Sequence, residues 1–332
     1  MLVSDLGEQG LLKLIQPYCL PNSIGDDGAI VRVPPEQELV VTTDVLVDRV
    51  HFSDQTTSPF DVGWRSVAAN LSDLAAMGAK PLGITVGLSL PPELPVVWLE
   101  QLYAGMQACL TQYGTGIIGG DLTRSSVITI AITALGAVKS DQGIRRSTAR
   151  GGDAIVVTGN HGSSYAGLQL LLNPELGADL TERDRDFLIA AHQRPQPRLD
   201  VLPILDELRQ SVSQVIPISG MDSSDGLADA IVQICRASGV GAILDRSAIS
   251  INPSLTQMLP DTALESALYG GEDFELVLCL PKPIAAQLVD RLNLGAAIIG
   301  TITQELEILV VDDINRSSPI DLDLKSGFQH FH

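Results

Sequence analysis

The chain has 332 residues, of which 45% are apolar, and a formal net charge of −19 at pH 7. Its length exceeds that of a single hydrophobic core, so we expect two domains. The negative charge excludes a nucleic-acid-binding surface and no apolar run is long enough to span a membrane, so neither nucleic acid nor a membrane is an expected partner.

The N-terminal region predicts a helix, an acidic turn and a strand. Residues 1–20 have an amphipathic pattern and contain Asp5, Glu8 and Lys13, which argues against a signal peptide and for a cytoplasmic location. The turn Gly25-Asp26-Asp27-Gly28 follows, and we expect an apolar strand from Ala29 directly after it. On its own, this acidic turn is also consistent with a plain hairpin.

A buried strand is predicted from Leu39 to Asp44, and it ends in two hydroxyls and a carboxylate. Ligand-facing groups lie at strand ends in α/β proteins, so Asp44 is expected to face a ligand. The alternative is that Asp44 only starts a turn. His51 follows closely, and its position is equally consistent with a packed residue and with a functional one.

The next predicted helix places a carboxylate among small side chains. It covers residues 62–77, with Asp61 as the expected N-cap and Gly78 as the C-cap. Asn70 and Asp73 share one face of it, and no Lys or Arg lies one turn away. Because a packed carboxylate needs a partner, we expect a metal ion at Asp73.

Strands are expected at 84–90, 117–123 and 127–138, with a helix at 93–113. The second of these strands contains Gly119-Gly120-Asp121, where glycines would let a phosphate approach the backbone. The polar connection from Gly143 to Gly152 carries three arginines that could reach phosphates, although a solvated linker fits equally well. It marks the expected boundary between domains 1–146 and 147–332.

The second half repeats the mixture of strands and helices, which predicts a mixed α/β fold in both domains. Helices are expected at about 165–172, 181–192, 199–210 and 227–238, and strands at 154–158 and 242–244. Asp222, Ser224 and Asp225 lie at a strand-to-helix turn, where carboxylates and backbone N–H groups can meet one ligand. Gly270–Leu278 is a fourth run that combines glycines, acids and a strand.

Several carboxylates can share a site only when cations lie between them, because like charges about 4 Å apart repel by about 4 kcal/mol at an effective dielectric constant near 20. Oxygen ligands select hard ions such as Mg²⁺, which also binds nucleotide phosphates. The sequence contains no Gly-Lys-Ser/Thr run, so it lacks a P-loop. A nucleotide would therefore be held mostly through metal.

These motifs resemble those of the thiamine-monophosphate kinase family, which belongs with the aminoimidazole ribonucleotide synthetases, selenophosphate synthetases and a hydrogenase maturation protein. The resemblance covers nearly the whole chain. It runs through Gly25-Asp26-Asp27, Thr42-Thr43-Asp44, Val50-His51-Phe52, Asn70–Gly78, Gly119-Gly120-Asp121, Met221-Asp222, Ser224–Leu227 and Gly270–Leu276. It implies an N-terminal domain that dimerises by joining sheets into a barrel, and a C-terminal α/β domain.

The resemblance also implies ATP-dependent phosphorylation of thiamine monophosphate to thiamine diphosphate, with several Mg²⁺ ions and ATP as co-substrate. Its implied Mg²⁺ ligands are Asp27, Thr42, Thr43, Asp44, Asp73, Asp121, Asp222 and Asp225, of which Asp44, Asp121 and Asp222 are the implied catalytic residues. Its implied ATP contacts are Tyr103, Gly120, Asp121, Arg146 and Ser224. Its implied substrate contacts are His51, Glu272 or Asp273, and Phe328.

Two departures from the family pattern stand out. Phe328 occupies the place of a Trp, which would leave a weaker cation–π contact with the thiazolium ring. Asn160-His161 stands where Leu or a similar residue is expected, so the shape of that loop differs.

Three alternatives remain open. The first is a sister enzyme of the same superfamily, but Cys19 is not in a glycine-rich loop and the chain does not end in Cys. The second is a non-catalytic sensor of nucleotide or thiamine phosphate. The third is metal-dependent phosphate hydrolysis.

Overall fold

The computed structural model describes residues 1–21, 23–24, 26–211, 216–292, 295–312 and 319–322. The chain divides into two compact units. The N-terminal unit comprises Met1–Leu74, Ala79–Asp141 and Gln193–Pro195, and the C-terminal unit comprises Ala75–Gly78, Gln142–His192 and the described residues from Gln196 onward. Both units mix helices and strands, as the sequence predicts. The chain passes from the first unit to the second mainly between Asp141 and Gln142, close to the domain boundary predicted between residues 146 and 147. That boundary stays a prediction.

The described residues of the N-terminal unit form a four-stranded sheet and three helices. The helices are α1 (Val3–Ile15), followed by a short 3₁₀ turn (Gln16–Tyr18), α2 (Pro59–Ala76) and α3 (Val96–Gln112). The strands are β1 (Gln37–Val47), β2 (Lys80–Leu90), β3 (Ile117–Arg124) and β4 (Thr129–Lys139). Their order is β1-β4-β2-β3, in which β2 and β3 are parallel and the other neighbours antiparallel.

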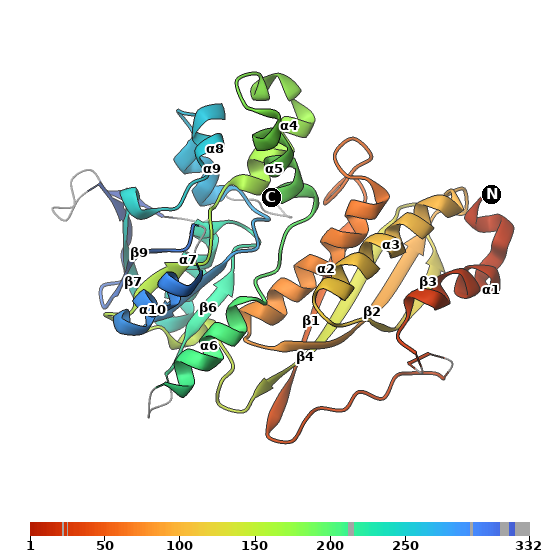
Figure 1. Cartoon of the computed structure of the whole chain (residues 1–332), viewed down its shortest axis with the longest axis horizontal. Coiled ribbons are helices and arrows are strands. Elements are labelled where there is room, and N and C mark those ends of the chain that lie inside the picture. The colour runs from red at the N-terminus through yellow and green to blue at the C-terminus, as the bar shows by residue number, and fades with distance from the viewer. Residues whose placement is uncertain (22, 25, 212–215, 293–294, 313–318, 323–332) are drawn as a thin grey trace. The chain divides into compact units, whose positions relative to one another are not determined.

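Among the described residues of this unit, helices cover one face of the sheet. Alternate residues of β2 and β4, such as Ile84, Val86 and Ile132, are buried, and α2 and α3 lie side by side over them (Figure 1). The two helices touch backbone to backbone, because a Cβ atom at Gly63 or Gly105 would collide with a main-chain carbonyl of the other helix. Helices α2 and α3 therefore pack closely against each other.

The start of α2 differs from the sequence prediction. Ser58, and not Asp61, is the N-cap: the Asp61 N–H donates to Ser58 Oγ over 3.3 Å, and the Ser58 hydroxyl donates to Asp61 Oδ2 over 2.5 Å. Ser58 thus caps the third helical residue, Asp61, through its side chain, and Pro59 begins the helix. Arg194 pairs with Asp61, and the Trp64 indole N–H donates to the Pro195 carbonyl over 2.8 Å.

The strand expected from Ala29 does not form. Residues 29–34 have no regular secondary structure, and Ile30 is 94% exposed. Pro34 and Pro35 follow and offer no N–H groups for strand pairing, so the ladder begins only at Gln37.

In the described part of the C-terminal unit, a seven-stranded sheet has the order β11-β10-β7-β9-β5-β8-β6. Its strands are β5 (Ala154–Val157), β6 (Ser219–Asp222), β7 (Gly241–Asp245), β8 (Leu276–Leu280), β9 (Ala297–Thr303), β10 (Ile308–Val311) and β11 (Ile320–Asp321). Its helices are α4 (Ser163–Leu172), α5 (Glu182–Gln193), α6 (Val201–Gln210), α7 (Leu227–Ser238), α8 (Pro253–Met258), α9 (Ala263–Tyr269) and α10 (Lys282–Leu292). Short 3₁₀ turns lie at Arg146–Thr148, Pro174–Gly177 and Arg246–Ala248.

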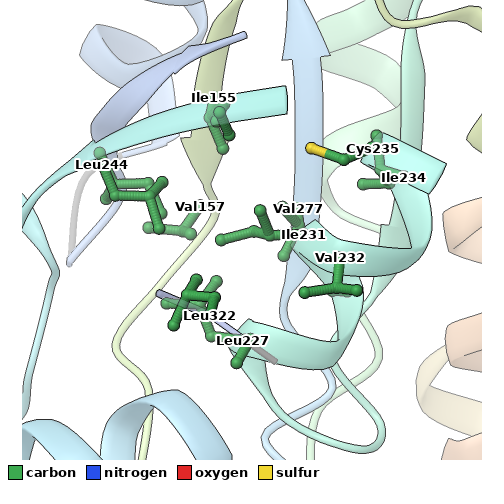
Figure 2. Close-up of a cluster of buried hydrophobic side chains, with 14 of the residues drawn as sticks. Ile155, Val157, Leu227, Ile231, Val232, Ile234, Cys235, Leu244, Val277 and Leu322 are labelled. Carbon is green, nitrogen blue, oxygen red and sulfur yellow. The ribbon is translucent and has the colours of Figure 1, made fainter. Parts of the chain in front are cut away.

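Helices cover both faces of this second sheet. Alternate strand residues such as Ile155, Val157 and Val277 pack with α7, whose Ile231 lies beside Val277 (Figure 2). The intervening residues, including Val156, pack with α6 and α10. Continuous apolar runs such as Ala154–Val157 follow from burial on both faces. None of the helices in the described parts of the chain has the length and apolar character needed to cross a bilayer.

Candidate active site

The site in the N-terminal unit is built where β1 faces α2. The Thr42 hydroxyl donates to Oδ2 of Asp73, so the helix carboxylate is bound to the strand. Asp44 lies two residues after Thr42 on β1, and its N–H donates to Asn70 Oδ1 over 3.1 Å. The Asn70 side-chain amide in turn donates to the Ser66 carbonyl over 2.9 Å. Thr42, Asp44 and Asp73 therefore come together on the helix-covered side of β1. The predicted strand end at Asp44 is wrong, because pairing with β4 continues to Val47 and Asp44 lies inside the strand. Asn70, which the sequence placed on the same helix face as Asp73, links β1 to α2 through this bond.

Thr43 points to the other side of the sheet. Side chains alternate along a strand, and the Thr43 hydroxyl lies 2.8 Å from the hydroxyl of Thr133 on β4. The structure thus does not bring the Thr43 side chain together with Thr42 and Asp44, and only its backbone remains near them.

Asp121 lies on β3, at the opposite edge of the four-stranded sheet from β1. The register pairs Asp121 with Gly87, Gly87 with Ala131 and Ala131 with Val45, so Asp121 shares a face with Val45 and not with Asp44. Gly120 packs tightly on β2, where a Cβ atom would collide with the Val86 carbonyl. Within one copy of the unit, Asp121 therefore does not join the Thr42–Asp44–Asp73 group.

The other predicted residues of this unit occupy separate positions. Asp27 is exposed in the bend that precedes β1. Tyr103 is buried on α3 with its ring centroid 5.5 Å from that of Tyr18, and burial raises the pKa of its hydroxyl. His51 Nδ1 accepts a hydrogen bond from the Val47 N–H over 3.1 Å. In the neutral imidazole the proton then resides on Nε2, which makes that nitrogen a donor.

In the C-terminal unit, the turn between β6 and α7 carries the second acidic group. Asp222 ends β6 and is 2% exposed, whereas Asp225 is exposed two residues before α7 begins. The Ser223 N–H donates to the Glu275 carbonyl over 2.8 Å, and the Glu272 N–H donates to the Ser224 carbonyl over 2.7 Å. The acidic glycine run before β8 therefore lies along this turn, and the two segments position each other.

Asp273 has a structural partner. Its two oxygens accept the N–H groups of Gly162 (2.6 Å) and Ser164 (2.9 Å) at the start of α4. Burial raises the pKa of Asp273 to about 7, against the effect of these backbone N–H groups. The flanking residues Glu272 and Phe274 have φ angles of 68° and 53°, which side-chain-bearing residues rarely adopt. Glu272 Oε2 itself lies 3.7 Å from His192 Nδ1.

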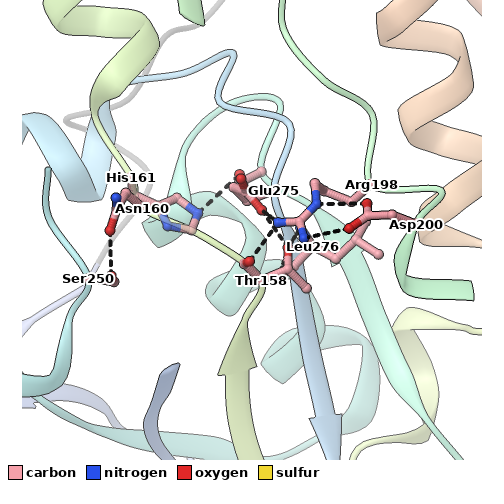
Figure 3. Close-up of polar contacts among 9 residues, drawn as sticks. Thr158, Asn160, His161, Arg198, Asp200, Ser250, Glu275 and Leu276 are labelled. Carbon is pink, nitrogen blue, oxygen red and sulfur yellow. Dashed lines mark hydrogen bonds and ion pairs between the residues drawn. The ribbon is translucent and has the colours of Figure 1, made fainter. Parts of the chain in front are cut away.

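A network of charged side chains that the sequence did not predict lies at the end of β5 and is centred on Arg198. Figure 3 shows Arg198 between Glu275 and Asp200, bonded to both carboxylates. Glu275 also accepts the Thr158 hydroxyl over 2.6 Å, and burial raises the pKa of its carboxyl while Arg198 opposes this. Thr158 at a strand end and the acidic run containing Glu275 were visible in the sequence. Arg198 carried no comparable signal.

Two further predicted residues lie apart. The exposed Arg146 donates to Gln233 Oε1 on α7 over 2.7 Å. Phe328 lies outside the described residues.

The donor set fits Mg²⁺ better than a transition metal. Among the described residues, no three His, Cys, Asp or Glu side chains form a ready-made metal site. Mg²⁺ does not need one, since it usually takes one or two carboxylates and completes its shell with water and phosphate. Thr42, Asp44 and Asp73 offer oxygen donors only, which suits that ion.

Comparison with known proteins gives this fold and site a class. Residues 25–138 match the N-terminal domain model of AIR synthase related proteins, and residues 150–312 match the corresponding C-terminal domain model. The two units are thus those of an AIR synthase related protein.

Individual relatives are more specific. Thiamine-monophosphate kinase of Synechococcus elongatus is 50% identical over 329 residues, which cover 99% of this chain and 98% of that protein. The crystal structure of thiamine-monophosphate kinase from Stenotrophomonas maltophilia K279a has a TM-score of 0.77 at 33% identity and covers 90% of this chain and 95% of that one. AaThiL complexed with AMPPCP and TMP has a TM-score of 0.72 at 30% identity, with 97% and 98% covered. The chain belongs to the thiamine-monophosphate kinase family.

Proposed function

We propose that the protein transfers the γ-phosphoryl group of ATP to the phosphate of thiamine monophosphate, which yields thiamine diphosphate. The observation that carries this is the 50% identity to the Synechococcus elongatus enzyme over 99% of this chain, a span that includes both acidic groups. A relative of the same fold was solved with AMPPCP and TMP, which supports ATP as the co-substrate.

The assay that tests this uses two acceptors. The protein is incubated with Mg-ATP and either thiamine monophosphate or free thiamine, and the products are separated by chromatography. Thiamine diphosphate from the first acceptor, with no phosphorylation of the second, is the expected result. Equal phosphorylation of free thiamine at its hydroxyl would contradict the proposal.

We infer that the reaction requires Mg²⁺, because ATP and thiamine monophosphate are both anionic and the proposed site is lined by carboxylates. Asp44, Asp73 and the Thr42 hydroxyl would hold it in the N-terminal unit, and Asp222 and Asp225 in the C-terminal unit. Mg²⁺ bound there would neutralise phosphate charge. The same reasoning keeps Asp27 and Asp121 as proposed ligands.

The proposed transfer is direct and in line, without a phosphoenzyme and without a catalytic base. The acceptor phosphate of thiamine monophosphate has a second pKa of about 6, as phosphate monoesters do, so it is largely ionised at pH 7. A kinase that acts on an alcohol needs a carboxylate or His to take the hydroxyl proton, and this one does not. His51 fits a different role, because its Nε2–H can donate to a phosphate oxygen while Nδ1 is engaged by Val47.

Glu272 is the better substrate contact of the two adjacent acids. Asp273 already accepts two N–H groups of α4, whereas the Glu272 side chain is 34% exposed beside His192. Ser224, Gly120, Tyr103 and Arg146 remain proposed nucleotide contacts, and Phe328 a proposed substrate contact.

We further propose a homodimer formed by the face of the four-stranded sheet that carries no helices. Leu39, Val41 and Val45 are 47%, 56% and 46% exposed on that face of β1. An apolar strip of this kind on an edge strand favours a second copy, and two four-stranded sheets can close into one barrel. Closure would bring the β3 edge of one protomer, which carries Asp121, next to the β1 edge of the other.

A further inference from the structure

The loop that joins β5 to α4 is bonded at consecutive positions to other segments of the C-terminal unit. The Asn160 side chain accepts the Ser250 hydroxyl over 2.6 Å, and the His161 N–H donates to the Ser250 carbonyl over 2.9 Å. The Gly162 N–H donates to Asp273. Asn160 thus points toward Ser250, while the His161 ring points away from it in Figure 3. The two side chains of this loop therefore reach different neighbours.

The His161 side chain reaches the acidic turn. Its Nε2 lies 3.1 Å from Ser223 Oγ, and both side chains are completely buried. Ser223 stands between Asp222, a proposed Mg²⁺ ligand, and Ser224, a proposed nucleotide contact. The Ser223 N–H is held by the Glu275 carbonyl, so the turn is fixed by its main chain on one side and by the imidazole on the other.

Packing alone does not require this pair. A buried imidazole and a buried hydroxyl both lose hydration on folding, and an alkyl side chain such as Leu would fill the same space without that cost. The hydrogen bond compensates for part of this cost, because in the described structure His161 Nδ1 is buried without a hydrogen-bond partner. The bond also fixes the direction of the Ser223 side chain. Burial lowers the pKa of His161 to about 4, so the ring is neutral at pH 7 and acts as a hydrogen-bonding group, not as a charge.

We propose that His161 is a positioning residue, which through Ser223 holds the Asp222–Ser224 turn in the orientation that binds the metal–nucleotide complex. This inference rests on the proposed function, because it assigns that turn to the nucleotide. It also gives the unusual Asn160-His161 pair a role: one side chain anchors the loop and the other anchors the turn.

The test compares the variant His161→Leu with the variants His161→Gln and Ser223→Ala. His161→Leu removes the bond and leaves the Ser223 hydroxyl without this hydrogen-bond partner. We expect KM for Mg-ATP to rise about three- to tenfold, which corresponds to the free energy of one hydrogen bond. KM for thiamine monophosphate should stay within about twofold of the parent value by the same reasoning. His161→Gln, whose amide can reach Ser223, should restore most of the affinity. Ser223→Ala should match His161→Leu, and the double variant should be no worse than either.

The matched control is Asn160→Ala, which disturbs the same loop through Ser250 without touching Ser223. It should lower the unfolding temperature but leave KM for Mg-ATP unchanged. Calorimetric titration of each variant with AMPPCP in the presence of Mg²⁺ measures the same affinity without turnover. It therefore separates a failure of this inference from a failure of the proposed activity.

Two results would overturn the proposal. One is an Asn160→Ala variant with the same loss of nucleotide affinity as His161→Leu, which would mean that the loop acts only through general packing. The other is an unchanged affinity for AMPPCP in a folded Ser223→Ala variant. This second variant keeps the proposal testable even if His161→Leu fails to fold.

Discussion

The Thr42 hydroxyl donates a hydrogen bond to Asp73 across 31 residues of sequence, and this contact ties β1 to α2. It aims the helix carboxylate at the strand that carries Asp44. The acidic group is therefore assembled by a strand-to-helix contact.

Asp44→Asn tests whether this group holds the metal. The change keeps the size of the side chain and the backbone bond to Asn70, so the unfolding temperature should stay within about 3 °C of the parent. Turnover should fall by about 100-fold or more, because a charge that stabilises the phosphoryl transfer is lost. Glu38→Gln, an exposed carboxylate on the same strand, is the control and should be fully active. Normal turnover in folded Asp44→Asn would refute the assignment.

Asp73→Asn separates the structural role of this side chain from its metal role. The amide oxygen can still accept the Thr42 hydroxyl, so stability without Mg²⁺ should change little. A ligand that binds only the folded state raises the unfolding temperature, and this rise with added Mg²⁺ should shrink in the variant. Scanning fluorimetry over a Mg²⁺ series measures both quantities. An undiminished Mg²⁺ response would show that Asp73 is not a ligand.

The proposed dimer can be broken on the face of the sheet without helices. Val41→Glu places a charge in the middle of the apolar strip, and sedimentation at micromolar concentration should detect monomers where the parent is a dimer. Val97→Glu on α3 is the matched control, because Val97 is 55% exposed, much as Val41 is, but lies on a helix. A monomeric parent protein, or loss of the dimer in both variants, would contradict the proposal.

His161 predicts a direction for the acid response of stability. Its folded pKa of about 4 lies below the ordinary value of 6.5, so below pH 6.5 the unfolded chain takes up a proton that the folded chain does not. Stability is therefore lost as the pH falls from 6.5 toward 4. At pH 5 the loss from this residue is about 2 kcal/mol. Urea unfolding of the parent and of His161→Leu at pH 7.5 and 5.0 should reveal a smaller acid-induced loss in the variant; an equal loss would contradict the prediction.

Much of the fold could be predicted because its signals are local. The periodicity of apolar residues placed α5, α6 and α7 within two residues of their observed bounds, and Gly78 with a φ of 74° does follow α2. The start of α2 was predicted too late because Ser58 and Asp61 both suit an N-cap, and only the hydrogen bonds distinguish them. The missing strand after Ala29 is also local, since Pro34 and Pro35 could have been weighed against it.

The arrangement of the site was harder to predict from the sequence. The two-residue period of β1 could have separated Thr43 from Thr42, but the resemblance grouped them. The capping of α4 by Asp273 joins residues more than 100 positions apart, and the His161–Ser223 bond spans 62. Such contacts depend on which strands become neighbours in the sheet, and no local pattern encodes that order.

The most direct test of the central claim is a ³¹P NMR time course with Mg-ATP and thiamine monophosphate. Transfer to the acceptor phosphate predicts that thiamine diphosphate and ADP appear together in equal amounts, with no inorganic phosphate. Formation of ADP and inorganic phosphate without thiamine diphosphate would contradict the account, because the acidic groups would then serve hydrolysis.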